Sequence, residues 1–569
     1  MTEIIKKYRF EILMIVIFFA LAFLQGYHFA QSDLTTYIPF ILNEYNPELL
    51  ANDLLIETID AHPVYIWKAL ATLMKFIDFE ILIPILFVFS LLFLIISLIY
   101  FYETFFGRSR FGLFLFLSML VITKATLAAG RFGLNPYTYF HPVVIGMGIS
   151  FLVLAFLARK RWLIAGLLAG FVFLLHPFTA IFACSFYGIS MITEFFQGKK
   201  LKPLFGLVLL LAISSFSWFP FVMHAFQESS MAFDTARWRE IVEVRLQYIF
   251  FRNWLPEHFL RIIAALTLWF FLRKRTELRK TLPIVITVTG ALIIAAIADF
   301  FTIKLFLQLQ LGRSTYFLYI LAASLIADKM TELVDKEITF KRLLFVFLPF
   351  FLISAQTADK GNLWAQIFVY ILALGSLPVL YHFREKINLK KAVIAISIIL
   401  ILVGTIDRVS KSYNKNGKIV PYSTNYEWKD IQLWTKEHIP LDETIMTPIY
   451  RNGFRTLSQH AIYPNIKDGG PHNYNKKTVF VWWDMMEDFG LVLDRDKFYD
   501  KAKALYHKNA KEIALKNDIR YIVYDKKYAT SDRPPLYENA TFGIIDLKQK
   551  PDFGLIYYGP MQELFDETN

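Results

Sequence analysis

Long apolar runs alternate with short basic clusters over the first 408 residues of the chain. The basic clusters comprise Lys6, Lys7 and Arg9, then Arg108 and Arg110, then residues 158–161, 199–202, 273–280, 329–342 and 384–391. An apolar run of about 20 residues is long enough for a helix to cross a bilayer. Loops rich in Lys and Arg are typical of the cytoplasmic side of a membrane. If every cluster is cytoplasmic, each neighbouring pair encloses room for two spans, and the N-terminus lies inside.

This pattern predicts an α-helical polytopic membrane protein with about thirteen transmembrane helices. The predicted spans are 10–29, 81–102, 111–129, 141–158, 162–176, 178–195, 204–222, 258–272, 282–300, 312–327, 342–357, 363–383 and 391–407. The first span lacks a small-residue cleavage site and is expected to be retained. Residues 162–195 are few for two helices, but His176 and Pro177 interrupt them, so two short helices meeting at the proline are expected.

The composition of the chain changes after residue 408, and no later stretch could span a membrane. Apolar residues at roughly helical spacing predict a helix over 426–440. Residues 444–449 and 519–525 are typical of strands, and 497–516 are typical of a helix. We therefore expect a transmembrane domain over 1–408, with a long first outer loop at 31–80, and a small extracytoplasmic α/β domain over 409–569.

Composition supports a membrane location. The chain is 56% hydrophobic and 19% charged, too apolar for an ordinary soluble protein. Its formal net charge of +12 comes with the basic clusters between apolar runs, so nucleic acid is not an expected partner. Cys184 is the single cysteine of the sequence, which excludes an intrachain disulfide and a cysteine-based metal site.

The first outer loop is rich in carboxylates, and two stretches in it, "LTTYIPFILNEY" and "VYIWKALATLMKFI", look amphipathic. Such helices lie along a membrane surface, where the loop could cover a site. The acidic residues are Asp33, Glu44, Glu48, Asp53, Glu57, Asp60, Asp78 and Glu80. Most of them are typical of a solvated face. Asp33 follows the first apolar run closely, so it is either a helix cap or a functional carboxylate.

Several basic residues fall in or beside predicted outer segments, where the positive-inside rule does not require them. They are Arg131, Arg237, Arg239, Arg245, Arg252, Arg261, Lys304 and Arg313. Guanidinium groups bind phosphate oxygens in pairs, which favours a substrate with phosphate in its headgroup. For each residue the alternative is a snorkelling contact with lipid. Arg313 at the start of a span and Lys124 inside an apolar run are costlier to place and are the stronger candidates.

Three histidines, His62, His141 and His176, each precede a proline. Three imidazoles could form a metal site. Alternatively, each pair is a helix break with a hydrogen-bonded ring.

The order of features along the chain resembles the GT-C superfamily of membrane glycosyltransferases, which use polyprenyl-phosphate-linked sugars. An acidic residue follows the first span, then come surface helices, many further spans and an outer C-terminal domain. Fragments such as "SDLTTYIPFI", "NPYTYFHPVVIGMGIS", "LQLGRS", "WTKEHIPLDETIMTPIYRNGFRTLSQHAIYPNIKD" and "VWWDMM" resemble a group of bacterial GT-C-like membrane proteins. The acidic motif of the superfamily is often a pair separated by one residue, whereas Asp33 has no acidic neighbour.

The resemblance implies an inverting sugar transfer, in which a carboxylate takes the acceptor's proton while the anomeric carbon leaves its phosphate. Asp33 would be the base or a metal ligand, with Asp53 as its acidic partner. The phosphate and the rest of the substrate would contact Lys124, Arg131, Arg313, His62, His141 and His176. The C-terminal domain, with "NGFRTLSQH" and "VFVWWDMM" expected on its surface, would receive the acceptor; the alternative is a structural cap with buried tryptophans.

The expected location is the bacterial inner membrane, with the N-terminus in the cytoplasm and the C-terminal domain outside. The expected partners are a polyprenyl-phosphate-linked sugar and membrane lipids, while protein partners are not identified. The sequence identifies no cofactor and leaves a divalent cation open. Two other functions stay open, a lipid or glycan transporter or flippase, and a non-catalytic envelope assembly protein.

Overall fold

The computed structural model describes residues 2–334 and 422–557, with short gaps, and scattered positions between 382 and 409. The short gaps are 63–64, 123–124, 128–129, 198–200, 228–230, 273–279, 424–425, 494–497, 532–533 and 549–554. The chain divides into two compact units, each built from three segments. The helical unit comprises Met1–Tyr27, Ile85–Phe216 and Tyr248–Tyr422, and the mixed unit comprises His28–Pro84, Ser217–Gln247 and Ser423–Asn569.

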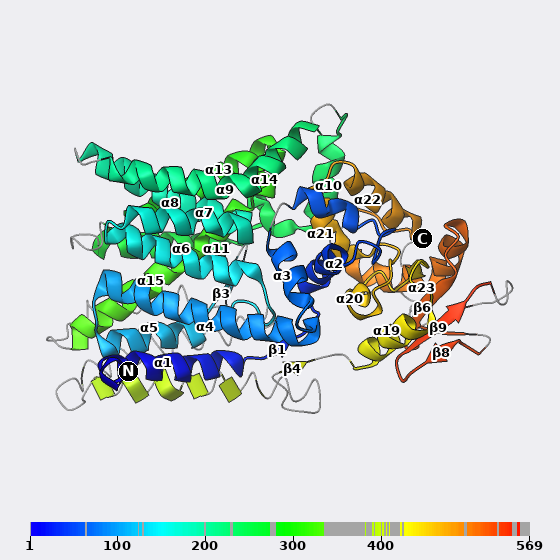
Figure 1. The fold of residues 1–569 in the computed structure, drawn as a ribbon, viewed down its shortest axis with the longest axis horizontal. Helices are drawn as coiled ribbons and strands as arrows, with labels where there is room; N and C mark the ends of the chain where they lie inside the picture. The colour runs from blue at the N-terminus through cyan, green and yellow to red at the C-terminus, as the bar shows by residue number, and fades with distance from the viewer. Residues whose placement is uncertain are drawn as a thin grey trace. The chain divides into compact units, whose positions relative to one another are not determined.

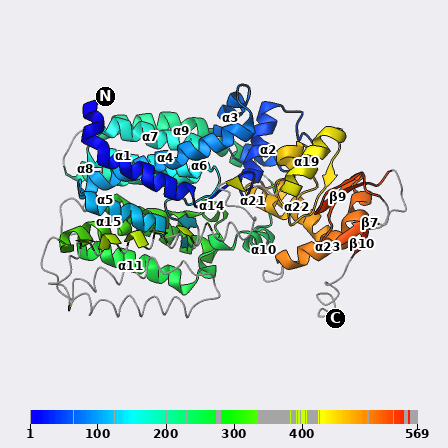
Figure 2. The ribbon, with the colours of Figure 1, turned by 90° about the horizontal axis from the view of Figure 1, so that it is seen from below.

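The helical unit contains long apolar helices that run roughly parallel to one another (Figures 1 and 2). They are α1 (Thr2–Phe23), α4 (Phe79–Phe106), α5 (Arg110–Ile122), α6 (Pro142–Ala158), α7 (Trp162–Leu175), α8 (Pro177–Phe196), α9 (Lys202–Gln227), α11 (Pro256–Leu272), α13 (Leu282–Phe301) and α15 (Thr315–Val334). The shorter elements are β2 (Ala125–Leu127), β3 (Gly130–Phe132), η2 (Gln247–Ile249), η3 (Phe251–Asn253), α14 (Lys304–Gln308) and η4 (Leu311–Ser314). The first turns of α4 and the last part of α9 belong to the mixed unit.

Four helices of the described residues are long and apolar enough to cross a membrane: Phe79–Phe106, Pro177–Phe196, Lys202–His224 and Leu282–Phe301. Shorter apolar helices occur at Arg110–Ile122, Pro142–Ala158, Trp162–Leu175 and His258–Leu272. Each predicted span from 10–29 to 312–327 coincides with a helix. The predicted spans 342–357 and 363–383 lie outside the described residues, apart from residue 382, and 391–407 lies largely outside them. The total of thirteen therefore stays a prediction.

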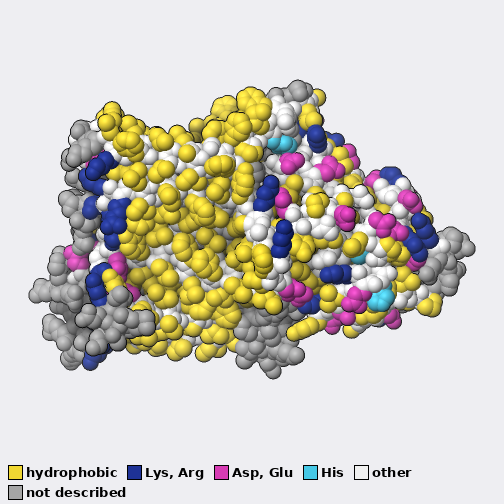
Figure 3. Space-filling view, viewed as in Figure 1, with side chains coloured by type: hydrophobic (Ala, Val, Ile, Leu, Met, Phe, Trp, Pro, Cys, Tyr) yellow, Lys and Arg dark blue, Asp and Glu magenta, His cyan; other side chains and the backbone are white. Residues whose placement is uncertain are grey.

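Hydrophobic side chains cover the helical unit on the face shown in Figure 3, and Lys and Arg gather at its left end. The tight connection between α6 and α7 contains three cations, Arg159, Lys160 and Arg161. Arg159 Nη1 donates to the Tyr100 hydroxyl at 2.6 Å, and Lys160 Nζ pairs with Glu194 at 3.0 Å. This is the distribution expected of helices whose basic ends face one aqueous compartment.

The predicted break at His176 and Pro177 is confirmed. Helix α7 ends at Leu175, and α8 begins at Pro177, because proline has no N–H to continue the hydrogen-bond ladder. Helices α7 and α9 approach so closely that only glycine fits between them. A Cβ on Gly166 would lie 2.0 Å from the carbonyl oxygen of Gly206, and one on Gly206 would lie 2.4 Å from that of Trp162.

The mixed unit combines helices and strands from all three of its segments. The first segment contains α2 (Leu34–Tyr45), η1 (Ile56–Ala61) and α3 (Ile66–Met74), and the second contains α10 (Thr235–Arg245). The third contains α19 (Tyr426–His438), β5 (Ile445–Met446), α20 (Phe454–Ser458), η5 (Ile466–Asp468), α21 (Gly469–His472), α22 (Thr478–Asp488), α23 (Phe498–Lys516), β6 (Tyr521–Asp525), β7 (Ala529–Ser531), β8 (Tyr537–Glu538), β9 (Phe542–Asp546) and β10 (Leu555–Tyr557). Two short strands, β1 (Tyr27–His28) and β4 (Tyr422–Ser423), lie where the chain passes between units.

A four-stranded sheet of order β5-β6-β9-β8 organises the C-terminal segment. Strand β6 pairs in parallel with β5, with Ile445 opposite Tyr521, and antiparallel with β9, with Val523 opposite Ile544. The helix α19 packs on this sheet through Trp428 and Ile431, which belong to one buried apolar cluster with its strands. The helices predicted over 426–440 and 497–516 and the strands predicted at 444–449 and 519–525 are confirmed. The domain boundary near residue 408 stays a prediction, because residues 410–421 lie outside the described residues.

Candidate functional site

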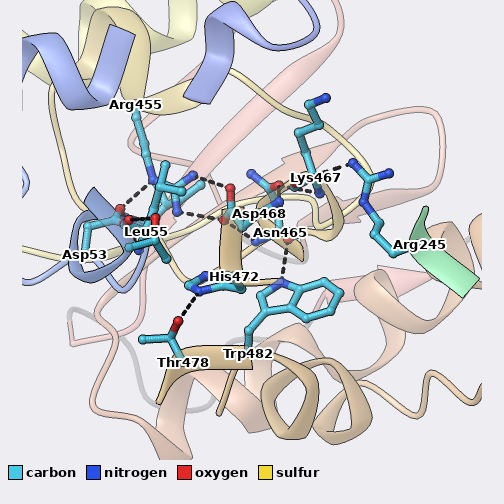
Figure 4. Close-up of polar contacts among 12 residues, drawn as sticks. Asp53, Leu55, Arg245, Arg455, Asn465, Lys467, Asp468, His472, Thr478 and Trp482 are labelled. Atoms are coloured by element: carbon cyan, nitrogen blue, oxygen red, sulfur yellow. Dashed lines mark hydrogen bonds and ion pairs between the residues drawn. The ribbon is translucent and has the colours of Figure 1, made fainter. Parts of the chain in front are cut away.

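A fully buried ion-pair cluster of Asp53, Arg455 and Asp468 lies inside the mixed unit (Figure 4). Arg455 Nε donates to Asp53 Oδ2 at 2.5 Å, and the two Nη atoms donate to the Asp468 carboxylate at 2.9 and 2.8 Å. Burial lowers the pKa of Arg455, but the Asp468 and Asp53 carboxylates outweigh burial and raise that pKa above its ordinary value. The cluster therefore holds three charges away from water, and each charge has a partner.

Asp53 is also bound by main-chain donors. The N–H of Leu55 donates to its Oδ1 and that of Ile462 to its Oδ2, both at 2.9 Å. Together with Arg455 these donors use both oxygens of a side chain that is 0% exposed. Asp53 thus joins the first segment of the unit to the third, and its predicted part in the reaction stays a prediction.

Helix α20 brings Arg455 into this cluster, and Gly453 directs the chain into the helix. Gly453 has a φ of +87°, a left-handed conformation that favours glycine, and a Cβ there would lie 3.0 Å from Thr35 Cγ2. Residues 454–458 are all buried, and Leu457 N donates to Gln432 Oε1 at 3.2 Å. The expectation that "NGFRTLSQH" lies on the surface is wrong, because the stretch is packed inside the unit, where Arg455, Ser458 and His460 find hydrogen-bond partners.

The tryptophans of "VFVWWDMM" are also buried. Trp482 and Trp483 are both 0% exposed. The Trp482 indole N–H donates to the carbonyl of Asn465 at 2.9 Å, and that of Trp483 donates to Glu487 at 2.6 Å. The alternative of buried tryptophans is therefore the correct one for this stretch.

Hydrogen bonds hold the turn at residues 465–468 in place. Asn465 Oδ1 accepts from the N–H groups of Lys467 and Asp468 at 2.8 and 3.3 Å, while Asp468 Oδ2 accepts from Asn465 N at 3.0 Å, which completes a capping box. Ile466 N donates to the carbonyl of Ile449 at 2.9 Å. Four N–H groups of the turn are thus satisfied within the unit, so Lys467 projects from a fixed backbone.

Lys467 pairs with Asp33, the first candidate carboxylate. Its Nζ lies 2.5 Å from Asp33 Oδ1, and the two side chains are 23% and 33% exposed. Asp33 occupies the N-cap position of α2, but its side chain accepts no capping hydrogen bond. The carboxylate therefore faces Lys467 at a position that water reaches, and it is not used as a helix cap.

Arg245, at the end of α10, contacts the same turn. Its Nε donates to the carbonyl of Ile466 at 2.9 Å and its Nη2 to that of Lys467 at 3.4 Å. Figure 4 shows Arg245 and Lys467 on the same side of the turn, away from the Asp53 and Arg455 pair. One carboxylate and two cations, from all three segments of the mixed unit, thus gather at this turn.

Two histidines pack in the mixed unit near the buried cluster. His472 is 0% exposed, its Nδ1 lies 2.8 Å from Thr478 Oγ1, and its ring stacks on Trp482. Burial, with Arg455 nearby, lowers the pKa of His472 to about 3. Burial also lowers the pKa of His62, whose Nδ1 lies 3.0 Å from the Thr58 carbonyl. Both rings are held as neutral groups in a packed interior.

The other two candidate histidines begin helices of the helical unit. His141 Nδ1 accepts from Val143 N at 3.1 Å at the start of α6, and His176 Nδ1 accepts from Thr179 N at 3.3 Å at the start of α8. Their ring centroids are 5.6 Å apart. His62 belongs to the mixed unit. In the described residues no three His, Cys, Asp or Glu side chains are arranged to hold a metal ion.

Of the three predicted phosphate-binding cations, Arg313 is described with its side chain. It lies in η4, half-buried, with Nη2 3.5 Å from the Tyr248 hydroxyl. Arg131 is the central residue of β3, opposite Thr126 of β2. Lys124 lies outside the described residues. The roles of all three stay predictions.

Sequence reasoning missed Lys467 and Asp468, and it placed Arg455 on the surface. All three lie in the fragment "YRNGFRTLSQHAIYPNIKD", which carried part of the family resemblance. A usable signal was the "NIKD" sequence, since Asn followed three residues later by an acidic residue resembles the pattern of a reciprocal cap.

No protein-family model matches the chain, and no curated protein matches it. Among solved structures, the chain is similar to the archaeal oligosaccharyltransferase AglB from Archaeoglobus fulgidus, in complex with an inhibitory peptide and a dolichol-phosphate. The TM-score is 0.41 and the sequence identity 10%, over 99% of this chain and 79% of that chain. At this level the likeness identifies neither a family nor an activity.

Proposed function

We propose that this protein is a membrane glycosyltransferase that moves a sugar from a polyprenyl-phosphate donor to a glycan, lipid or protein outside the cytoplasm. One observation carries the proposal. The Asp33 carboxylate is one-third exposed, is not used as a helix cap and is held by Lys467 on a rigid turn. A general base must be able to reach its substrate, which the exposure of Asp33 allows, and Lys467 fixes the position of the carboxylate.

In the proposed reaction Asp33 accepts the proton of the acceptor's hydroxyl or amine. The freed electron pair forms a bond to the anomeric carbon of the sugar, and the bond from that carbon to the phosphate oxygen breaks. The polyprenyl phosphate leaves with that electron pair, and cations stabilise its negative charge. The transition state has oxocarbenium character, as in other sugar transfers.

A lipid-linked donor suits a chain with several apolar helices, because the polyprenyl tail stays in the membrane while its phosphate lies at the surface. Asp53 takes a supporting part in this proposal. The Asp53 side chain is buried in its ion pair with Arg455 and is not exposed to water, whereas a general base must reach its substrate. Asp53 instead fixes Arg455 and, through Asp468, the turn that carries Lys467.

Replacement of Asp33 tests the proposal directly. The variant Asp33→Asn keeps the shape of the side chain and removes its charge, so it should lose transfer activity by about 10²-fold or more while folding normally. The assay is consumption of a polyprenyl-phosphate-linked sugar by the full chain in proteoliposomes. The matched control is Asp488→Asn, which removes a carboxylate of similar exposure from an ion pair with Lys516 in the same unit. Full activity of Asp33→Asn would rule out this mechanism.

A further inference from the structure

The turn at residues 465–468 brings two cations together where both side chains are partly exposed. Lys467 and Arg245 both lie at the turn, and among their described contacts Asp33 is the one carboxylate partner. The Asp468 carboxylate is not available to these cations, because Arg455 binds both of its oxygens inside the unit.

We propose that Lys467 and Arg245 form the binding site for the phosphate of the lipid-linked donor, and that this phosphate draws Lys467 away from Asp33. The inference rests on the proposed function and adds a ligand site to it. A lysine ammonium is a compact point charge with three donors, while the Arg245 guanidinium keeps donors on Nη1 and Nη2 beyond the two that the carbonyls of the turn accept.

The geometry of the turn supports a preformed site. Its backbone is held by Asn465, by the carbonyl of Ile449 and by the indole of Trp482. Arg245 uses Nε and Nη2 on the two carbonyls of the turn, which fixes the plane of its guanidinium. A site whose cations are already oriented loses little freedom when an anion binds.

The exposure of the ion pair supports the exchange. Asp33 and Lys467 are 33% and 23% exposed, so water already screens their attraction and the pair costs little to open. The neighbouring pair of Asp53 with Arg455 is 0% and 2% exposed, and opening it would leave two charges unpaired in a dry interior. The first pair is therefore the one that a ligand can open, and the second anchors the site.

The exchange links binding to the chemistry of Asp33. Before the donor binds, Lys467 holds the carboxylate in an ion pair, and a paired carboxylate is a weaker base. When the phosphate takes the ammonium group, Asp33 loses the cation that makes it a weaker base. No bond is made or broken in this step, and only the ion pair changes partner.

Binding measurements on the full chain test the site without any transfer reaction. The probe is undecaprenyl phosphate, titrated into phosphatidylcholine nanodiscs that contain the protein. We expect Lys467→Met and Arg245→Met each to weaken binding about tenfold, and Lys467→Arg to keep most of it. Asp33→Asn should strengthen binding several-fold, because it removes the anion that competes for Lys467. That gain should disappear in the double variant with Lys467→Met.

The controls are Lys516→Met and Asp488→Asn, which alter an exposed Lys–Asp pair of the same unit and should leave binding unchanged. The gain of Asp33→Asn cannot arise from misfolding, which only weakens binding. Parental affinity of Lys467→Met, or of Asp33→Asn, would overturn the proposal, as would equal losses in the controls.

A second arm of the experiment separates the donor from ordinary lipid. Phosphatidylglycerol, added at the same concentration, should not displace undecaprenyl phosphate. Displacement would assign the site to bulk headgroups and overturn the donor site. Chain that binds the probe as expected but transfers no sugar would contradict the proposed function alone. Chain that transfers sugar while Lys467→Met binds normally would contradict this inference alone.

Discussion

Arg455 donates a hydrogen bond to Asp53 across 402 positions of sequence, and both side chains are almost fully buried. The pair connects the segment after the first apolar helix to the C-terminal segment. With Asp468 it forms the anchor on which the exposed pair of Asp33 and Lys467 depends. The two ion pairs therefore differ in kind, one closed to water and one open to it.

The buried ion pair of Arg455 and Asp53 should contribute strongly to stability. Arg455→Met leaves two carboxylates buried without their cation, which costs about 3 to 5 kcal/mol. Unfolding of the full chain in detergent, followed by tryptophan fluorescence, measures this loss, since Trp482 and Trp483 are buried in the same unit. Arg237→Met is the control, because Arg237 and its partner Asp484 are 38% and 58% exposed and their pair contributes under about 1 kcal/mol. Equal stabilities of the two variants would contradict the assignment.

Asp53→Asn separates the two roles considered for Asp53. If Asp53 is an anchor, the variant loses stability, and its activity falls only as far as the turn at 465–468 loosens. If Asp53 acts on the substrate, the variant keeps the parental unfolding midpoint and loses transfer. We expect the first result, because Arg455 and two main-chain N–H groups use both oxygens of this carboxylate, and its side chain is 0% exposed.

Stability of the mixed unit should fall with acid through His472. The pKa of His472 is lowered by burial from 6.5 to about 3 in the folded chain. Between pH 6.5 and about pH 3, the unfolded chain therefore binds a proton at His472 that the folded chain does not bind. The contribution of His472 is fully present above pH 6.5 and is lost as the pH falls toward 3, at up to about 1.4 kcal/mol per pH unit.

Denaturant unfolding at several pH values checks this dependence. His472→Gln should show a shallower loss of stability below pH 6.5 than the parent, and the two should run parallel above pH 7. A variant with the same slope as the parent throughout would show that His472 is not the group responsible.

The contact between α7 and α9 should tolerate no added methyl group. Gly206→Ala places a Cβ 2.1 Å from the Tyr187 hydroxyl and 2.4 Å from the Trp162 carbonyl, and overpacking of this kind costs about 1 to 3 kcal/mol. Gly188→Ala is the matched control within α8, since a Cβ there meets nothing within 4 Å. It should raise stability by up to about 1 kcal/mol. Thermal inactivation in detergent distinguishes the two, and a stable Gly206→Ala would contradict the close packing.

Reporter fusions test the membrane topology. Six helices of the described residues, α4 to α9, separate the first and second segments of the mixed unit along the chain. If each of them crosses the membrane, as the sequence predicts, the even number returns the chain to the side that it left. Fusions at residues 160, 200 and 276 should report the cytoplasm, and fusions after residue 410 should report the outer side. A cytoplasmic signal after residue 410 would place Asp33 away from any donor exposed outside.

The helices could be predicted because their signal is local. Apolar runs located ten helices of the described residues, and the His176 and Pro177 pair located the break between α7 and α8. The exposure of residues 452–460 was predicted wrongly for a physical reason. A stretch as polar as "NGFRTLSQH" is typical of a surface, yet Arg455 is buried because Asp53 and Asp468 neutralise it.

The candidate site was only half predictable. Asp33 could be singled out because a carboxylate near the end of an apolar run is costly to place. Its partner Lys467 lies 434 positions away, and no local period or spacing specifies which of many lysines will pair with it. Arg245 was predicted to be an outer cation, but its partners are two main-chain carbonyls. Every residue has a main-chain carbonyl, so the sequence does not indicate which ones Arg245 contacts.

The separation of Asp53 from Arg455 also bears on how the chain is synthesised. At about 5 to 20 residues per second, the ribosome needs roughly 20 to 80 s to reach Arg455 after it has made Asp53. For that interval the early segment has neither its cation nor its main-chain donor at Ile462. A nascent chain halted before residue 455 cannot form the ion pair between Asp53 and Arg455. Its first acidic segment would then lack these contacts and be accessible to quality-control proteases.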